Sequence, residues 1–238
     1  KNNSINSPYF KLDSFKNKLK LLKVKYEGIN FEAKMQAFLL KYSKSSVINK
    51  ELKAKLLTNN NKFYGRKVLI IGGSRGIGSF VAKVLALLGS KVTISYFACY
   101  EDALDVCKDI NQNNAKEKAD LLKFDVLKDK FSDINNARYH DLFYFATPKI
   151  FDKDSDAFSE EIYIQFKKVY ADAFREIALE FMERGGEKIY YPSSVAVEQD
   201  IKGMEEYKMA KKDGELVCND LNMRFPLEIL IDRLDRVN

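Results

Sequence analysis

Residues that form metal sites and disulfides are scarce in this sequence. Its 238 residues include one histidine, three cysteines and no tryptophan. Cys99, Cys107 and Cys218 are scattered, odd in number and never in a CxxC spacing, so we expect reduced cysteines, no disulfide and no metal centre. Reduced cysteines are typical of a cytoplasmic protein, and we expect that location. His140 lies in a polar stretch, which favours a surface position over a catalytic one.

Long apolar segments are also missing. No stretch approaches the roughly 20 residues of a membrane span, and no signal-peptide pattern opens the chain. We therefore expect no insertion into a membrane. The chain begins with Lys1 instead of methionine, which indicates a fragment boundary. Its length allows one substantial core, which favours a single α/β domain with an appendage.

Basic residues are concentrated in the N-terminal quarter. Residues 1–66 hold 15 Lys and Arg against 4 Asp and Glu, a net charge of +11. Residues 67–238 hold 25 against 30, a net charge of −5, and the two regions together give +6. From Phe10 to about Leu57, apolar residues recur every three to four positions, which predicts a basic helical arm over 1–62.

Three interpretations of the basic arm remain open. Its lysines form a solvated face while its apolar stripe packs on a neighbour, or they contact an acidic partner such as a carrier protein, or they bind nucleic acid or a membrane surface. The arm lacks the interleaved aromatic residues of a stacking platform. We therefore expect neither a nucleic-acid nor a membrane partner.

The rest of the chain is organised around residues 67–96. Val68–Ile71 is an unbroken apolar run, typical of a strand buried on both faces. Between this strand and a helical apolar repeat lies the loop Gly72-Gly73-Ser74-Arg75-Gly76-Ile77-Gly78. Glycines permit a tight turn and a close approach to phosphates at a helix N-terminus. The segment predicts a nucleotide-binding turn, with a turn that only packs the helix on the sheet as the alternative.

Strands and helices alternate along the remaining chain. Further strands are predicted over 92–94, 121–126, 141–146, 188–191 and 227–234, and further helices over 100–111, 158–184 and 205–222. Such alternation predicts an α/β fold with a Rossmann-type doubly wound parallel sheet over 63–238. The predicted helical N-terminal extension precedes it.

Three motifs occur in order along residues 67–234. Gly72–Gly78 resembles a TGxxxGxG loop with Ile71 in place of Thr. Ser193-Ser194-Val195 follows the fifth predicted strand, and Tyr207-Lys208-Met209-Ala210-Lys211 matches YxxxK, thirteen residues beyond Ser194. YxxxK alone is a common helical pattern, but the combination is specific. Together these motifs resemble the short-chain dehydrogenase/reductase family.

The resemblance implies a ketoreductase in which Ser194, Tyr207 and Lys211 are catalytic. Tyr207 would protonate a carbonyl oxygen as hydride reaches the carbonyl carbon from the nicotinamide, and Ser194 would position that oxygen. Lys211 lies on the same side of the helix as Tyr207. Its ammonium would lower the pKa of Tyr207 from about 10, and would hold the nicotinamide ribose. Ser193 is expected to be a structural neighbour.

The expected cofactor is NADP(H). NAD-selective members usually place an acid after the second strand, but Ser95-Tyr96-Phe97 has none, and Arg75 resembles the residue that binds the 2′-phosphate in NADP-using members. Asp125 would contact the adenine amine, with Val126 beside the ring. The cofactor-binding residues implied are Gly72, Gly73, Ser74, Arg75, Gly76, Ile77, Gly78, Ser95, Asp125, Val126, Ala146, Thr147, Tyr207 and Lys211.

The sequence also departs from the family. The family has an NNAG motif after the fourth strand, and only its alanine is present here, as Ala146. The asparagine that often completes a catalytic tetrad in the long helix is also missing, since Lys167–Ala173 reads KKVYADA. Either a water and a backbone carbonyl complete the proton relay, or turnover is slow. Asp235-Arg236 replaces the usual Pro-Gly. The final strand and substrate loop are missing: they are removed, supplied by another segment, or absent in nature.

The predicted function is NADPH-dependent reduction of a ketone. The substrate is a 3-ketoacyl thioester on an acidic acyl carrier protein, or a polar small carbonyl compound. Pro192 and Gly214-Glu215 resemble the extended sugar-nucleotide branch of the family, so a sugar-nucleotide-modifying enzyme is one alternative. A non-catalytic NADP-binding sensor or assembly module is another. Family members often pair through their long helices, so a homo-oligomer is a further expectation.

Overall fold

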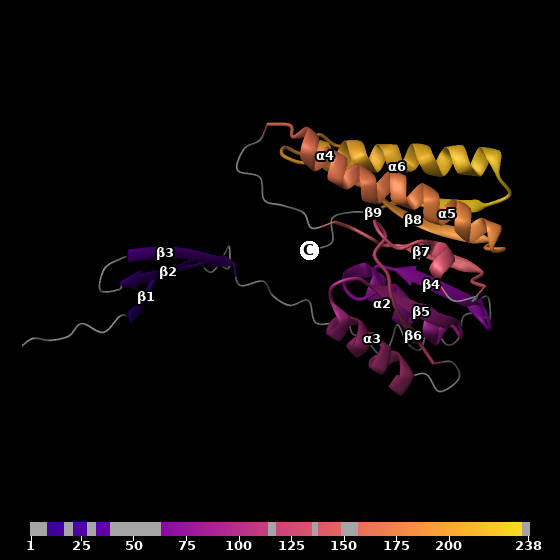
Figure 1. Ribbon diagram of the computed structural model, residues 1–238, viewed down its shortest axis with the longest axis horizontal. Helices are drawn as coiled ribbons and strands as arrows, with labels where there is room; N and C mark the ends of the chain where they lie inside the picture. The colour runs from indigo at the N-terminus through magenta and orange to yellow at the C-terminus, as the bar shows by residue number, and fades with distance from the viewer. Residues whose placement is uncertain are drawn as a thin grey trace, which may run out of the picture. The chain divides into compact units, whose positions relative to one another are not determined.

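A computed structural model describes residues 9–16, 21–27, 32–38, 63–113, 118–134, 138–148 and 157–234 (Figure 1). The chain divides into two units, Lys1–Lys44 and Ser45–Asn238. Asp235-Arg236 lies outside the described residues. Within the described ranges, no helix is long and apolar enough to cross a membrane.

The first unit contains a three-stranded antiparallel sheet where a helix was predicted. Strand β1 (Tyr9–Lys16) pairs with β2 (Leu21–Glu27), and β2 pairs with β3 (Glu32–Phe38). The prediction of a helical extension is therefore corrected over these strands. Its remaining parts, residues 1–8, 17–20, 28–31 and 39–62, lie outside the described residues.

The alternation along β2 explains this correction. From Leu22 to Glu27 its apolar residues alternate with charged ones, and this period of two is typical of a strand. In the strand register, Val24 lies opposite Leu12 on β1 and Met35 on β3. Short apolar repeats fit both a period of two and a period of three to four, so pairing with neighbouring strands decides between them.

The second unit is built on a parallel sheet of six strands. Its order is β6-β5-β4-β7-β8-β9, which in chain order is 3-2-1-4-5-6. The strands are β4 (Lys67–Ile71), β5 (Lys91–Tyr96), β6 (Asp120–Lys123), β7 (Asp141–Tyr144), β8 (Lys188–Ser194) and β9 (Glu228–Leu234). This order confirms the predicted Rossmann-type doubly wound sheet.

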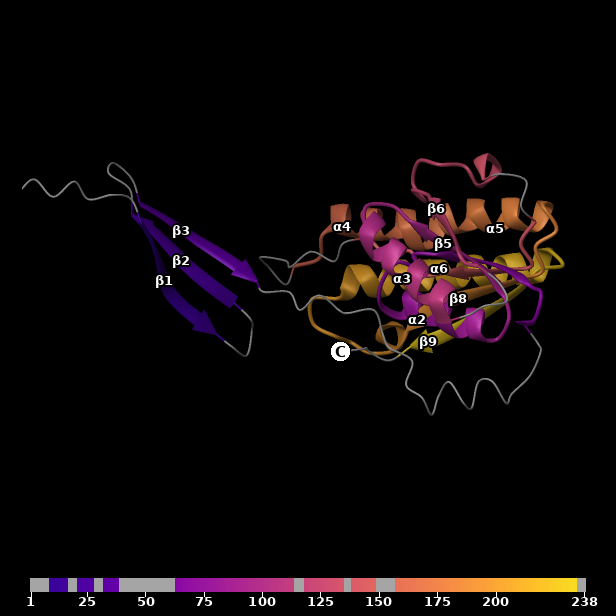
Figure 2. The same cartoon turned by 90° about the horizontal axis from the view of Figure 1, so that it is seen from below.

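Helices cover both faces of this sheet (Figures 1 and 2). One face carries α2 (Gly76–Leu87) and α3 (Tyr100–Asn113), and the other carries α4 (Glu160–Lys167), η4 (Lys168–Ala173), α5 (Phe174–Glu183) and α6 (Glu205–Arg224). Val68 and Ile70 of β4 belong to the core under α2 and α3, whereas Leu69 and Ile71 belong to the core under α5 and α6. A strand covered on both faces must be apolar throughout.

The short helices η3 (Phe131–Asp133) and η5 (Val195–Val197) complete the described elements. Strand β8 extends to Ser194, three residues beyond its predicted end, so both serines of the motif belong to the strand. His140 lies at the opposite, amino-terminal edge of the sheet, where its Nδ1 accepts a hydrogen bond from the Lys67 N–H at 2.9 Å.

The long helix between β7 and β8 contains a π-helical turn, η4. Two buried tyrosines bind its carbonyl groups: the Tyr144 hydroxyl donates to the Val169 carbonyl at 2.7 Å, and the Tyr191 hydroxyl donates to the Tyr170 carbonyl at 2.9 Å. π-helical turns are rare and occur frequently at functional sites. This one contains Tyr170, which lies close to the predicted catalytic residues.

Candidate functional site

Most of the predicted site residues lie at the carboxyl ends of the parallel strands, and Tyr207 and Lys211 lie on α6. The glycine-rich loop follows β4, Asp125 follows β6, Thr147 follows β7, and Ser194 ends β8. The sheet order reverses between β4 and β7. In open α/β sheets, ligands bind outside the carboxyl ends of the strands at such a reversal.

The loop after β4 is held by the neighbouring strand. The Gly72 N–H donates to Ser95 Oγ at 3.1 Å, and Ser95 is 2% exposed. Ser95 therefore supports the loop through a buried hydrogen bond. Its predicted direct contact with a cofactor stays a prediction.

The first turn of α2 fits a pyrophosphate group. Its N-cap residue Arg75 makes no side-chain hydrogen bond to the turn, and the turn contains no acid. The first N–H groups of a helix have no partner within the helix. Gly76 has a positive φ of +55°, and a Cβ added there would meet nothing within 4 Å. Free N–H groups, the positive end of the helix dipole and open space together suit an anion.

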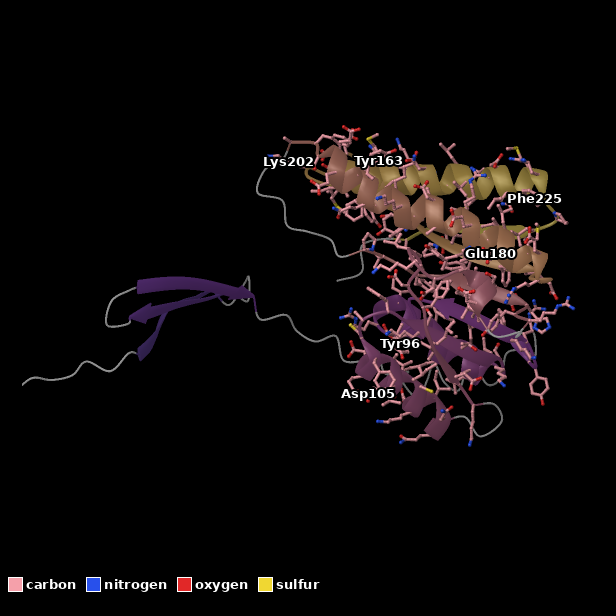
Figure 3. The ribbon with its side chains drawn as sticks, in the orientation of Figure 1. Tyr96, Asp105, Tyr163, Glu180, Lys202 and Phe225 are labelled. Carbon is pink, nitrogen blue, oxygen red and sulfur yellow. The ribbon has the colours of Figure 1, made fainter. Side chains whose placement is uncertain are left out.

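Arg75 lies beside an acid of the neighbouring helix. Its Nε is 3.5 Å from Oδ2 of Asp102, in the first turn of α3. At the end of β5, the ring of Tyr96, labelled in Figure 3, lies 5.4 Å from that of Tyr100, and the Phe97 side chain is exposed. Asp102 was missed as a site residue. The sequence did contain a signal for Asp102, because Glu101 and Asp102 lie at the start of the helix predicted after the second strand.

The two residues predicted to contact adenine follow β6. Asp125 Oδ1 accepts a hydrogen bond from the Leu127 N–H at 3.1 Å, and Oδ2 lies 3.8 Å from Lys128 Nζ. Val126 packs against the core beside Phe166 and Tyr170. Asp125 is thus held by a local turn at the sheet edge where the prediction places the adenine.

The structure brings Ser194 and Tyr207 together. Ser194, at the end of β8, is near enough to Tyr207 of α6 to affect its ionisation, and Ser194 Oγ accepts a hydrogen bond from the Ala196 N–H at 3.2 Å. Burial raises the pKa of Tyr207 above its usual value, although the nearby Ser194 hydroxyl acts in the opposite direction. This corrects the expectation that Lys211 lowers the pKa of Tyr207. The tyrosine is protonated at neutral pH.

The Lys211 side chain is buried among three tyrosine rings. Its Nζ donates to the Pro192 carbonyl at 2.7 Å and lies 4.0 Å from the ring centroid of Tyr170, 5.1 Å from that of Tyr191 and 5.9 Å from that of Tyr207. Burial lowers the pKa of Lys211 to about 7. The amine is therefore partly neutral at neutral pH.

Replacing Lys211 with methionine is expected to stabilise the fold by on the order of 2 kcal/mol at about pH 6. The folded-state pKa of about 7 lies below the value of about 10.4 in an unfolded chain. Between these values the unfolded chain binds more protons, so the stability of the native protein increases with pH. Methionine fills similar space without a charge.

Urea unfolding of both proteins at about pH 6 and about pH 9.5 measures this effect. The advantage of Lys211→Met should shrink at the higher pH. Lys212→Met, at an exposed neighbouring position, is the control and should show no such dependence. An advantage of the same size at both pH values would contradict the prediction.

Tyr170 is a site residue that the motifs did not reveal. Its hydroxyl lies 2.6 Å from Thr147 Oγ1, and its ring meets the Tyr207 ring edge-on at 5.7 Å. It comes from the KVYADA turn, in which the family's asparagine is missing. Tyr170 therefore links the loop after β7 to Tyr207 and Lys211.

Ser193 has a different environment from Ser194. It is buried and donates to Glu215 Oε1 at 2.5 Å. Arg233 of β9 donates to both oxygens of Glu215, at 2.9 and 2.6 Å, and holds the pKa of that carboxyl below its usual range. Ser193 thus joins β8 to α6 and β9, and Ser194 is the serine paired with Tyr207.

No family model and no curated protein sequence matches the chain. Several solved structures do. A short chain dehydrogenase from Shigella flexneri has a TM-score of 0.63 at 15% identity, over 73% of this chain and 74% of that chain. A citronellol catabolism dehydrogenase from Pseudomonas aeruginosa has a TM-score of 0.63 at 16% identity, over 74% and 77%.

A third solved structure contains a nucleotide. It is FolM alternative dihydrofolate reductase 1 from Brucella canis, complexed with NADP, with a TM-score of 0.57 at 19% identity over 69% of this chain and 70% of that chain. At these identities the similarity is one of fold. The chain has the fold of the short-chain dehydrogenases and reductases, which confirms at that level the resemblance found in its motifs.

Proposed function

We propose that this protein is an NADPH-dependent oxidoreductase that reduces a ketone. The observation that carries the proposal is the pairing of Ser194, at the carboxyl end of β8, with the neighbouring Tyr207 of α6. Reduction of a carbonyl requires a donor that positions the oxygen and an acid that protonates it. A serine hydroxyl and a protonated tyrosine supply these two groups.

NADPH, when bound, supplies the hydride. The uncapped first turn of α2 binds its pyrophosphate and Arg75 binds its 2′-phosphate, while Asp125 and Val126 contact the adenine. Tyr207 donates its proton to the oxygen as negative charge develops there, because burial keeps the hydroxyl protonated. Ser194 hydrogen-bonds the same oxygen.

Lys211 and its carbonyl partner support this proton transfer. In its charged form, Lys211 stabilises the tyrosinate that proton donation leaves on Tyr207. Its bond to the Pro192 carbonyl holds the amine in place. This carbonyl is the backbone group that a relay needs where the family's asparagine is missing.

The proposed substrate is a ketoacyl thioester on an acidic carrier protein, or a polar small carbonyl compound. The charge of +11 over residues 1–66 supports the carrier protein. The features that resembled the sugar-nucleotide branch have structural contacts: Glu215 binds Ser193 and Arg233. They lend that alternative no support. Homo-oligomer formation stays a prediction.

The proposal is tested with NADPH and a carbonyl panel of ketoacyl thioesters on carrier protein, ketoacyl thioesters of small thiols, and simple ketones. We expect NADPH to be consumed with at least one ketoacyl compound. Ser194→Ala should lower kcat by about 10²-fold while leaving the Kd for NADPH within about threefold, because the serine acts on the substrate oxygen.

Ser193→Ala is the matched control. It removes the neighbouring hydroxyl that binds Glu215, so it should reduce stability and leave kcat within about threefold. Binding of NADPH without reduction of any compound in the panel would instead favour the non-catalytic module. A wild-type protein that does not bind NADPH would overturn the proposal.

A further inference from the structure

We propose that Asp102 sets how strongly this protein prefers NADPH over NADH, by competing with the 2′-phosphate for Arg75. This inference rests on the proposed use of NADPH. It assigns the selection between the two nucleotides to Asp102, which lies on α3 and not at the end of β5.

The fold brings Arg75 and Asp102 together at the edge of the sheet where the glycine-rich loop lies. Arg75 is the N-cap of α2 after β4, and Asp102 is in the first turn of α3 after β5. The neighbouring strands β4 and β5 are parallel, so both helices start at the same edge of the sheet. The guanidinium contacts Asp102 and makes no hydrogen bond to its own helix turn.

The ion pair between Arg75 and Asp102 is weak enough for Arg75 to change partners. Its atoms are 3.5 Å apart, and the side chains of Arg75 and Asp102 are 59% and 28% exposed. Exposed pairs at such distances are weak, so Arg75 can leave Asp102 when a stronger partner arrives. A phosphate monoester carries nearly two negative charges at neutral pH and binds a guanidinium through two hydrogen bonds.

Asp102 then acts differently on the two nucleotides. When NADPH binds, the Asp102 carboxylate competes with the 2′-phosphate for Arg75, and it repels that phosphate once the phosphate is bound. When NADH binds, there is no 2′-phosphate, and the same carboxylate can accept a hydrogen bond from the ribose 2′-OH. The balance between Arg75 and Asp102 therefore sets the ratio of the two affinities.

Asp102→Asn should lower the Kd for NADPH by about fivefold and raise the Kd for NADH by about twofold. Arg75→Gln should raise the Kd for NADPH by about tenfold and change that for NADH little. The decrease in the Kd for NADPH caused by Asp102→Asn should become smaller as salt is added, because Arg75 is exposed and Asp102 is only partly buried. In the Arg75→Gln protein, Asp102→Asn should lower the Kd for NADPH by less, because only the direct repulsion between Asp102 and the 2′-phosphate is then removed.

The Kd values are measured by calorimetry for NADPH, NADH, and adenosine diphosphate with and without a 2′-phosphate. Asp105→Asn is the matched control: it is the same change at an exposed position one turn along α3, labelled in Figure 3. It should alter the ratio of the NADPH and NADH affinities by less than about twofold. The adenosine compounds isolate the 2′-phosphate from the nicotinamide.

Two results would overturn the inference while leaving the proposed function in place. One is an equal change in both nucleotides' affinities in Asp102→Asn. The other is an effect of Asp105→Asn as large as that of Asp102→Asn. If the wild-type protein binds neither nucleotide, the proposed function fails, and the inference fails with it.

Discussion

Replacing Tyr207 with phenylalanine is expected to lower kcat by about 10³-fold while leaving the Kd for NADPH within about threefold. The Tyr207 ring meets Phe166 and Tyr170 edge-on, at centroid distances of 5.9 and 5.7 Å. Phenylalanine keeps these contacts and removes only the hydroxyl that faces the Ser194 side of the site. The loss should therefore fall on the chemical step and not on folding or nucleotide binding.

Single-turnover reduction with a compound from the carbonyl panel measures this step directly. Tyr163→Phe, on α4, is the matched control, because the Tyr163 hydroxyl donates to Asp213 at 2.6 Å (Figure 3). The control should keep kcat within about twofold. If the Tyr207→Phe enzyme were as fast as the wild type, Tyr207 would not be the acid that protonates the substrate.

The pH profile separates Tyr207 from Lys211. Reduction needs protonated Tyr207, and burial raises its pKa, so its proton should stay bound to at least about pH 10. A decline in rate near pH 7 would instead belong to Lys211, whose pKa is about 7. The stability measurements on Lys211→Met give an independent value for that group.

Replacing Gly214 with alanine is expected to reduce the free energy of unfolding by about 3 kcal/mol or more. The added Cβ would overlap the Tyr191 hydroxyl and lie 2.7 Å from the Tyr170 carbonyl oxygen. Both tyrosines are buried, and their mutual hydrogen bond would break or α6 would move away from the sheet. On helix propensity alone, the same change would stabilise the protein by about 1 kcal/mol.

Urea denaturation of Gly214→Ala gives the size and the sign of this effect. The double variant with Tyr191→Phe is the internal control, because losing the hydroxyl removes the closest overlap and leaves the contacts of the new Cβ at 2.7 Å with the Tyr170 carbonyl oxygen and the Cζ of residue 191. It should recover part of the stability lost in the single variant. An increase in stability for Gly214→Ala would show that α6 packs less closely on Tyr191 than the structure has it.

Local patterns were enough to predict the parallel sheet and the main motifs. The apolar run Val68–Ile71 identified β4 because a strand covered on both faces excludes polar residues. The glycine-rich loop and the Tyr207-to-Lys211 spacing were visible because each motif is a short stretch whose function requires its residues side by side in the chain.

The arm over residues 9–38 could not be predicted in the same way. Its short apolar repeats satisfy both a helical and a strand period, and the register of β1, β2 and β3 decides between them. Strand pairing joins residues that are far apart along the chain. A single segment does not contain that information.

The electrostatics of the site were likewise decided by the tertiary structure. Asp102 lies beside Arg75 only because two parallel strands start their helices at one edge of the sheet. The pKa values of Tyr207 and Lys211 shift because packed rings from distant segments exclude water from them. Motif spacing places such residues on the same side of a helix, but burial, which sets their charge, depends on the whole fold.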